Sequence, residues 1–400
     1  MNVDYYPTWP SLVTMAGLLG LASTPLLTAA DTPPSDTKSR VSSLDGLRGF
    51  LAYGVFFGHA ARYHLYLQNG GWGFTTAFYD MAQTGAVALF FMITGYLFWR
   101  KLLAKNGHPD WLGLYVGRIF RIGPLYLITI TGMLAVVFLR APIGQEPLRG
   151  LAKEIASWMM LGVNYTKLDV NGYPNTHGIL FGVTWTLHFE WLFYFCLAFL
   201  AVPARSKYHL QIVTIALAAC LVHLVLTHRA GLKIEMFAAV FLLGMLSGSL
   251  EERHWLIGGS QTVKSAIAVV FLALFAATQA VDYAPLPAIF LGGLFYAIIS
   301  GADLFGLLTS KAARRLGDVS FGIYLLQGLV VTTVFSTTWA RSTALRSPAG
   351  HWSMMGGCAI LLLILATLAH VYVERPGIKA GRAIARFLHR SLKAASIKTT

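Results

Sequence analysis

Long apolar runs dominate this sequence, and each is about as long as a helix that crosses a membrane. Such a helix needs roughly 20 apolar residues, and only helices and closed barrels leave no backbone group unpaired in lipid. We therefore predict an all-α polytopic membrane protein with ten transmembrane helices. The expected spans are residues 44–65, 79–99, 121–140, 183–203, 210–228, 234–250, 263–281, 287–306, 320–340 and 352–373.

Residues 11–30 leave the number of spans open. They are apolar, but Pro25 and many small residues make them a weak span. No basic residue precedes Lys38, which argues against a cleaved signal peptide. An eleventh span and a disordered N-terminal segment are therefore both open interpretations of residues 1–43.

Charged residues make up 12% of the chain, whereas soluble proteins carry about 25%. So few charges cannot cover a globular surface, and we expect membrane lipid as the surrounding partner. We assign residues 44–376 to one membrane domain and residues 377–400 to a basic amphipathic tail on the inner leaflet. The three cysteines lie in apolar runs without the spacing of a metal site or a disulfide framework, so we expect no metal.

The basic residues predict the orientation of the chain. The net charge is +14, but the lysines and arginines lie mostly between apolar runs, which indicates topology and not a nucleic-acid partner. With both ends of the ten-span domain inside, 22 of the 31 lysines and arginines fall on the inner side. This predicts a multi-pass protein with a cytoplasmic C-terminus. The long external stretch at residues 141–182 is expected to cover a site on the outer face, with Trp158 at the membrane interface.

Arg48 and His59 form the first candidate site. They are eleven residues apart, so a helix places them on nearly one face with a rise of about 16 Å between them. If Arg48 marks the inner boundary, His59 lies near the midplane of a core about 30 Å thick. An ionisable group there is costly, and a histidine suits general-base work. A buried histidine that only bonds between helices explains this feature equally well.

Arg118 and Arg121 are the second candidate, at the expected inner end of the third span. Arginines three residues apart share a helix face. A pair of guanidinium groups has the right geometry to clamp phosphate. Simple anchoring of the span by its positive end is the alternative interpretation.

The fourth span opens with Trp185, Glu190 and Tyr194. Glu190 is expected about 10 Å inside the outer boundary, where a carboxylate must be paired, protonated or facing water. Tyr194 follows one turn later. Trp185 either stacks on a sugar ring or belongs to the aromatic belt of the interface.

Further polar residues occur late in the chain. Tyr324 lies in the ninth expected span, and Glu374, Arg375 and Pro376 close the tenth. We expect Glu374 and Arg375 to form an ion pair at the end of that helix, which Pro376 breaks.

Taken together and in this order, these elements resemble the acyltransferase family 3 membrane proteins, from about Leu44 to Pro376. The family motifs are met by Arg48 with His59, by Arg118 with Arg121, by Trp185 with Leu187 and Glu190, and by Glu374-Arg375-Pro376. The family often has a histidine where this chain has Gln327, which puts the role of that position in doubt.

The resemblance implies transfer of an acyl group, usually acetyl, from cytoplasmic acyl-CoA to an extracytoplasmic glycan such as O-antigen or exopolysaccharide. Acetyl-CoA is then the donor, and the bacterial inner membrane is the expected location. The implied roles are catalysis for His59 and Glu190, donor binding for Arg48, Arg118 and Arg121, acceptor binding for Trp185 and Tyr194, and support for Asp45, Tyr324, Glu374 and Arg375.

Two other classes fit ten spans with buried charge: a transporter or flippase for a lipid-linked glycan, and an inactive sensor. Transporters often show internal repeats and several intramembrane charges. This sequence shows no such repeat and few such charges, and it keeps both His59 and the paired arginines. These features favour the acyltransferase.

Overall fold

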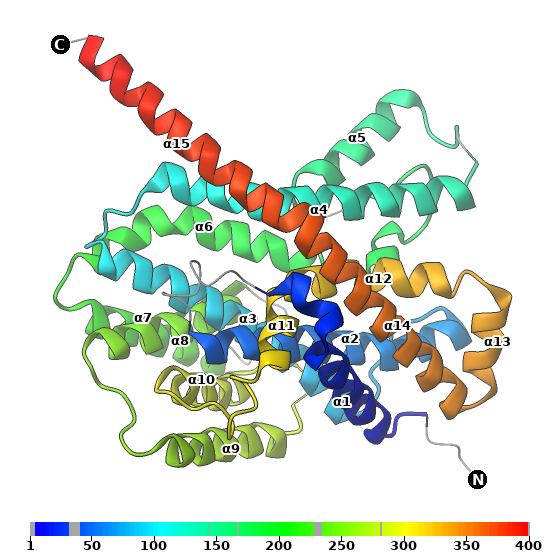
Figure 1. Ribbon diagram of the computed structural model, residues 1–400, viewed down its shortest axis with the longest axis horizontal. Helices are drawn as coiled ribbons and strands as arrows, with labels where there is room; N and C mark the ends of the chain where they lie inside the picture. Colours follow the sequence, from blue (N-terminus) through cyan, green and yellow to red (C-terminus); the bar gives the residue numbers. More distant parts are fainter. Residues whose placement is uncertain are drawn as a thin grey trace.

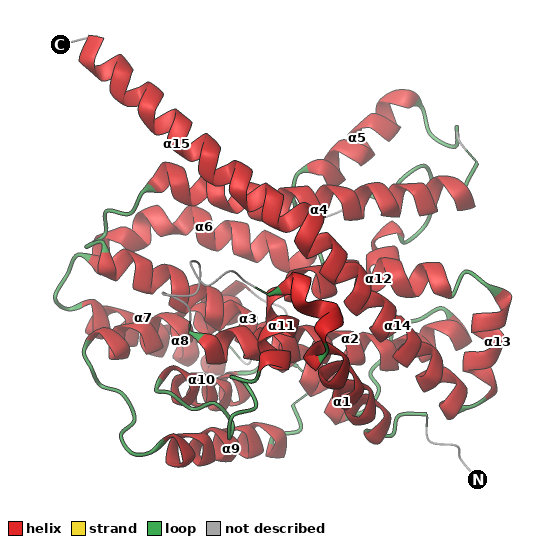
Figure 2. Cartoon of the chain, in the orientation of Figure 1, coloured by secondary structure: helices red, strands yellow, loops and turns green. Residues whose placement is uncertain are grey.

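Helices form nearly all of the regular structure in this computed structural model, which describes residues 5–31, 41–142, 144–165, 168–227, 234–280 and 282–398. Figure 2 shows helices joined by loops, without a strand in the part of the chain that is described. The all-α prediction is therefore confirmed for these residues. Most of the helices lie side by side with their axes roughly parallel in the view of Figure 1.

Six helices are long and apolar enough to cross a membrane. Five of them are α3 (Ala77–Ala104), α4 (Trp111–Arg140), α6 (Trp185–Ala204), α7 (His209–Leu226) and α8 (Ile234–Glu252), and the sixth runs through Pro348–Leu392. The protein is thus a multi-pass membrane protein.

The count of ten spans is not established by these helices. α1 (Trp9–Ser23), α9 (Gln261–Ala277) and α10 (Pro285–Ile299) are apolar but shorter than 18 residues. A helix of 15 residues rises only about 22 Å, less than the roughly 30 Å of the hydrocarbon core. α2 (Ser42–Asn69) is long enough but carries several polar side chains, His59 and Arg62 among them.

A bent pair of helices replaces the ninth expected span. α11 (Lys311–Asp318) and α12 (Ser320–Val334) meet at an angle of 63° and count as a seventh span if they are one broken helix. α13 (Thr338–Arg346) follows as a separate short helix. The bend brings α11 against α2, where Gly46 and Gly317 are required: a Cβ at either position would overlap a carbonyl oxygen of the other segment, that of Leu308 or of Asp45. This contact places the start of α2 beside the start of α12.

The end of the chain differs from the prediction. α14 (Pro348–Ala369), the π-helical turn η4 (His370–Glu374) and α15 (Arg375–Lys398) continue one another, and no break occurs at Pro376. In the wide turn the N–H of Arg375 bonds to the carbonyl of His370, five residues back. A π-turn shifts the register of the carbonyls, and we attribute the accommodation of the proline ring to this shift. α15 packs against α4, and its far end projects from the bundle (Figure 1).

The stretch at residues 141–182 folds back on α4. It contains α5 (Leu148–Met159) and the 3₁₀ turn η3 (Thr176–Leu180). Trp158 is fully buried and not interfacial, since its backbone carbonyl accepts from Tyr126 at 2.8 Å and its indole donates to Leu168 O at 2.8 Å. The η3 end of this segment leads directly to the candidate site.

Candidate active site

His59 lies in the middle of α2 and is bonded by two glutamines. Its Nδ1 is 3.1 Å from Oε1 of Gln327 on α12, and its Nε2 is 2.8 Å from Nε2 of Gln83 on α3. The amide nitrogen of Gln327 donates to Tyr324 O at 2.8 Å, which turns its oxygen toward the histidine. Nδ1 therefore carries the proton, and Nε2 presents its lone pair to the Gln83 amide.

His59 and Gln83, the partner of its Nε2, line a cavity of about 320 Å³, which we call the histidine pocket. Its walls include the aromatic side chains Trp72, Phe181, Trp185, Tyr283 and Tyr324. The rings of His59 and Phe181 have centroids 5.2 Å apart, so the segment after η3 covers the histidine. A volume above 300 Å³ lies in the range of ligand sites.

Arg62 brings a positive charge to the same pocket. It stands one turn after His59, and its guanidinium donates to Asp80 Oδ1 through Nε at 2.9 Å and Nη2 at 2.6 Å. Asp80 is 1% exposed. This pair ties α2 to α3 and fixes the position of the charge.

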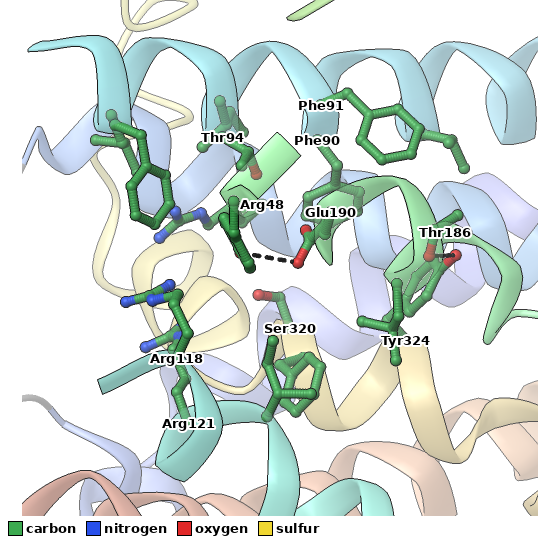
Figure 3. Close-up of a pocket in the computed structure, with 18 residues that line it drawn as sticks. Arg48, Phe90, Phe91, Thr94, Arg118, Arg121, Thr186, Glu190, Ser320 and Tyr324 are labelled. Carbon is green, nitrogen blue, oxygen red and sulfur yellow. Dashed lines mark hydrogen bonds between the residues drawn. The ribbon is translucent and has the colours of Figure 1, made fainter. Parts of the chain in front are cut away.

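A second cavity, the arginine pocket, contains Arg48, Arg118 and Arg121 together with Glu190 and Tyr194. Its volume is about 130 Å³. Figure 3 shows the three arginines at one end, Thr186 and Tyr324 at the other, and Glu190 between them. The pocket is thus narrow and strongly charged at one end.

Helices α2, α4 and α6 supply these charges. Arg48 is 3.5 Å from Asp45, and Arg118 lies over the ring of Phe98 at 5.1 Å. Glu190 interacts electrostatically with all three arginines, and its Oε2 accepts from Tyr194 at 3.0 Å. Three arginines and one carboxylate, Glu190, line the pocket, while Asp45 pairs with Arg48 beside it. A lining rich in arginine suits an anionic ligand.

The helix that carries the paired arginines begins earlier than the expected span. α4 begins at Trp111, so Arg118 and Arg121 stand about two to three turns after its first residue. The early start is explained by Asp110, whose side chain caps the helix by accepting from Gly113 N at 2.9 Å. That bond, assisted by His389, also lowers the pKa of Asp110.

The two pockets share a wall. Val87 and Tyr324 line both of them. The hydroxyl of Tyr324 is 2.9 Å from Thr186 Oγ1 and donates to Val183 O at 3.2 Å, which holds the ring against the start of α6. Tyr324 and Val87 therefore form the wall between the arginines and the histidine.

The structure regroups the residues predicted for the acceptor. Trp185 lines the histidine pocket, but Glu190 and Tyr194 line the arginine pocket and do not contact His59. The pairing predicted between Glu374 and Arg375 takes a different form, because both contact His370: Glu374 Oε2 lies 3.4 Å from its Nδ1, and Arg375 Nε donates to its Nε2 at 3.2 Å.

Three functional-site residues escaped the sequence reasoning: Arg62, Asp80 and Gln83. All three lie within the expected first and second spans, where any ionisable or amide side chain needs a partner. Their position in an apolar run was the available signal. Which helix each one faces could not be inferred, because that depends on packing between α2, α3 and α12.

The family comparison decides the class of protein. A model of the acyltransferase domain of family 3 matches residues 41–372, most of the chain. The chain belongs to acyltransferase family 3. The enzyme is accordingly an acyltransferase that transfers groups other than amino-acyl groups, and not a transporter. Among curated proteins, Nodulation protein 10 of Rhizobium leguminosarum bv. viciae is similar, with 23% identity over 365 residues that cover 84% of this chain and 93% of that protein. No solved structure matches.

Proposed function

We propose that this acyltransferase moves an acetyl group from cytoplasmic acetyl-CoA to a sugar hydroxyl of an extracytoplasmic glycan such as O-antigen or exopolysaccharide. One observation carries the proposal: an arginine-lined pocket and an aromatic pocket around His59 share a wall formed by Tyr324 and Val87. The first pocket suits the donor and the second suits the acceptor.

The length of the donor matches the spacing of the site. Arg48 and His59 belong to the same helix, so their backbones are about 16 Å apart along its axis. About thirteen bonds separate the inner phosphate of coenzyme A from its sulfur. At about 1.2 Å per bond, the spacing of an extended peptide, this arm also spans about 16 Å. Phosphates held by Arg48, Arg118 and Arg121 would thus put the thioester near His59.

The narrowness of the arginine pocket fits the same arm. The arginine pocket, at about 130 Å³, is the smaller of the two and suits an unbranched chain. The histidine pocket is more than twice as large and has aromatic walls, Trp72 and Trp185 among them. Sugar rings stack on such surfaces through their apolar faces, while their hydroxyls stay available for hydrogen bonds.

At His59 the lone pair of Nε2 takes the proton of the sugar hydroxyl as its oxygen attacks the thioester carbonyl. The new C–O bond forms and the C–S bond breaks, so that coenzyme A leaves as a thiolate and recovers the proton from the imidazole. The Gln83 amide, which occupies Nε2 in this structure, must yield to the hydroxyl. A positioned base contributes about 10²–10⁴ in rate.

Glu190 has a different role from the one expected for an acceptor residue. Because it faces Arg48, Arg118 and Arg121, it offsets part of their charge when no donor is bound and orients them with Tyr194. We assign Trp185 alone of the predicted acceptor residues to the sugar.

The proposal includes ten membrane spans with the C-terminus in the cytoplasm of a bacterial cell. It is supported by the distribution of basic residues, 22 of 31 on one side, and by the contact of His389 with Asp110 at 2.9 Å. That contact places the C-terminal helix beside the start of α4, on the side assigned to the cytoplasm. Coenzyme A would then approach from the end where the arginines lie.

Two measurements test the proposal. Purified protein in lipid nanodiscs, given acetyl-CoA and an oligosaccharide acceptor, should release free thiol in step with acetylated sugar. Mass spectrometry of envelope glycans from strains with and without the gene should then differ by acetyl groups. The proposal would be ruled out if the purified protein released no thiol from any acyl-CoA and the envelope glycans of the two strains did not differ.

A further inference from the structure

A basic groove lies between α15, α4 and the end of α3, and the reaction above does not use it. We call it the tail groove. Its volume is about 700 Å³. Five basic or ionisable side chains line it, Lys101, Lys379, Arg382, Arg386 and His389. The single carboxylate on its wall is Asp110, which already accepts from Gly113 N and contacts His389.

The tail groove adjoins the arginine pocket along two helices. On α4, Gly117 of the groove and Arg121 of the pocket are four residues apart and share a face. On α3, the same spacing relates Lys101 of the groove to Leu97 of the pocket. Lys101 and Arg118 are close enough to interact electrostatically. A strip of positive charge thus runs from the tail helix to the arginine pocket.

The floor of the groove is open at Gly117. Three glycines line the groove, Gly113, Gly117 and Gly381, but a Cβ would meet nothing within 4 Å only at Gly117, whereas at Gly113 it would meet the Asp110 carboxylate. Lys101, Lys379, Arg382 and Arg386 are exposed around this floor. A phosphorylated group can therefore approach the helix closely with basic side chains on several sides.

We propose that the tail groove binds the 3′-phosphorylated adenosine end of the donor. This inference rests on the proposed function, in which the arginine pocket holds the diphosphate and the pantetheine arm points toward His59. The nucleotide then extends away from His59, toward the tail groove. A phosphate monoester carries a charge of about −1.5 to −2 at neutral pH, and Lys and Arg bind it by charge-assisted hydrogen bonds.

The test compares two donors that differ only in that phosphate, acetyl-CoA and 3′-dephospho-acetyl-CoA. In the wild-type protein we expect the KM of the dephospho donor to be about tenfold higher, the size of a lost charged contact, with kcat little changed. In Arg382→Ala, and again in Lys379→Ala, the two donors should have nearly equal KM values. Because the ratio is taken within one variant, it does not depend on how much of the protein is folded.

Arg390→Ala is the matched control. It removes the same charge from the same exposed helix, but Arg390 does not line the tail groove. This variant should keep the wild-type ratio of the two KM values. Measurements at low ionic strength give the largest contrast, because exposed charges are screened by salt.

Three outcomes would overturn the inference. A wild-type ratio retained in Arg382→Ala and Lys379→Ala would leave the proposed function intact but remove the groove from it. Discrimination that is seen only in nanodiscs of phosphatidylcholine alone, and is lost when phosphatidylglycerol is added, would assign the groove to an anionic lipid headgroup. If the wild-type protein releases no thiol from either donor, the proposed function itself fails.

Discussion

Gln327 accepts a hydrogen bond from His59, with 3.1 Å between Oε1 and Nδ1, and its own amide nitrogen is anchored on Tyr324 O. The family often has a histidine at position 327, which had put the role of the glutamine in doubt. The geometry gives the glutamine the task of fixing one tautomer of His59, with the basic lone pair on Nε2 beside the Gln83 amide. A neutral histidine at position 327 could accept the same bond.

Gln327→Leu should lower kcat by about 10- to 100-fold, because the buried N–H of His59 would lose its acceptor at a cost of about 1–3 kcal/mol. Gln327→His should keep most of the activity. Steady-state rates of thiol release at saturating acetyl-CoA compare the three proteins. Equal rates for Gln327→Leu and wild type would show that the bond does not matter.

Tyr324 should control leakage between the two pockets. Tyr324→Ala removes the wall between them, so water from the histidine pocket could reach the thioester, and hydrolysis of acetyl-CoA without acceptor should increase. Tyr324→Phe keeps the ring and loses only its hydroxyl bonds, worth about 0.5–1.5 kcal/mol each, so its leakage should stay near that of the wild type. Thiol release in the absence of acceptor is the measurement. If Tyr324→Ala released no more thiol than the wild type in the absence of acceptor, this role would be contradicted.

Arg121→Ala should raise the KM for acetyl-CoA by about 10- to 100-fold, the effect expected from losing a charge-assisted bond of about 1.5–3 kcal/mol. The KM for the acceptor should not change, since the arginine pocket lies across Tyr324 from the sugar. The KM of Arg121→Lys for acetyl-CoA should lie between those of the wild type and Arg121→Ala, because lysine keeps the charge but not the planar guanidinium group. A change confined to the acceptor would count against donor binding.

The N-terminal segment should be held to the domain by a pH-dependent ion pair. Arg315, which is 3% exposed, donates to both oxygens of Asp31 at 2.5 and 3.0 Å. These bonds lower the pKa of Asp31 below its usual 3.8. A depressed carboxyl pKa stabilises the folded contact above the unfolded pKa, and this stabilisation is lost as pH falls through the folded value.

Hydrogen exchange at residues 9–31 can follow this contact. Protection should persist at pH 5 to 7 and decline only below about pH 4, whereas Asp31→Asn should show weaker protection than the wild type at pH 5 to 7 and similar protection at the lowest pH. Protection in the variant that equals the wild type at pH 7 would mean that the ion pair does not hold the segment.

The sequence predicted helices and motifs better than it predicted neighbours. Periodicity and apolar length identified α2, α3 and α4, and spacing alone placed Arg48 and His59 on one helix. Helix starts were less secure, because Asp110 caps α4 ten residues before the expected span. Glu190 was predicted to take part in catalysis near the outer end, but packing of α6 against α3 turns it to the arginines.

Contacts between distant segments could not be predicted from one chain. The bonds of His59 come from α3 and α12, 24 and 268 residues away. Pro376 was expected to end the last helix, since proline normally breaks one. The π-turn before it, which no local pattern signals, allows the helix to continue.

The most direct test of the account is acetyl transfer by His59→Ala in lipid nanodiscs, measured beside wild type and beside Arg390→Ala, a variant remote from both pockets. The account predicts that His59→Ala elutes as a folded protein and binds acetyl-CoA normally, while its turnover falls by about 10²–10⁴. Wild-type turnover in His59→Ala would contradict the central claim that this imidazole removes the proton of the sugar hydroxyl.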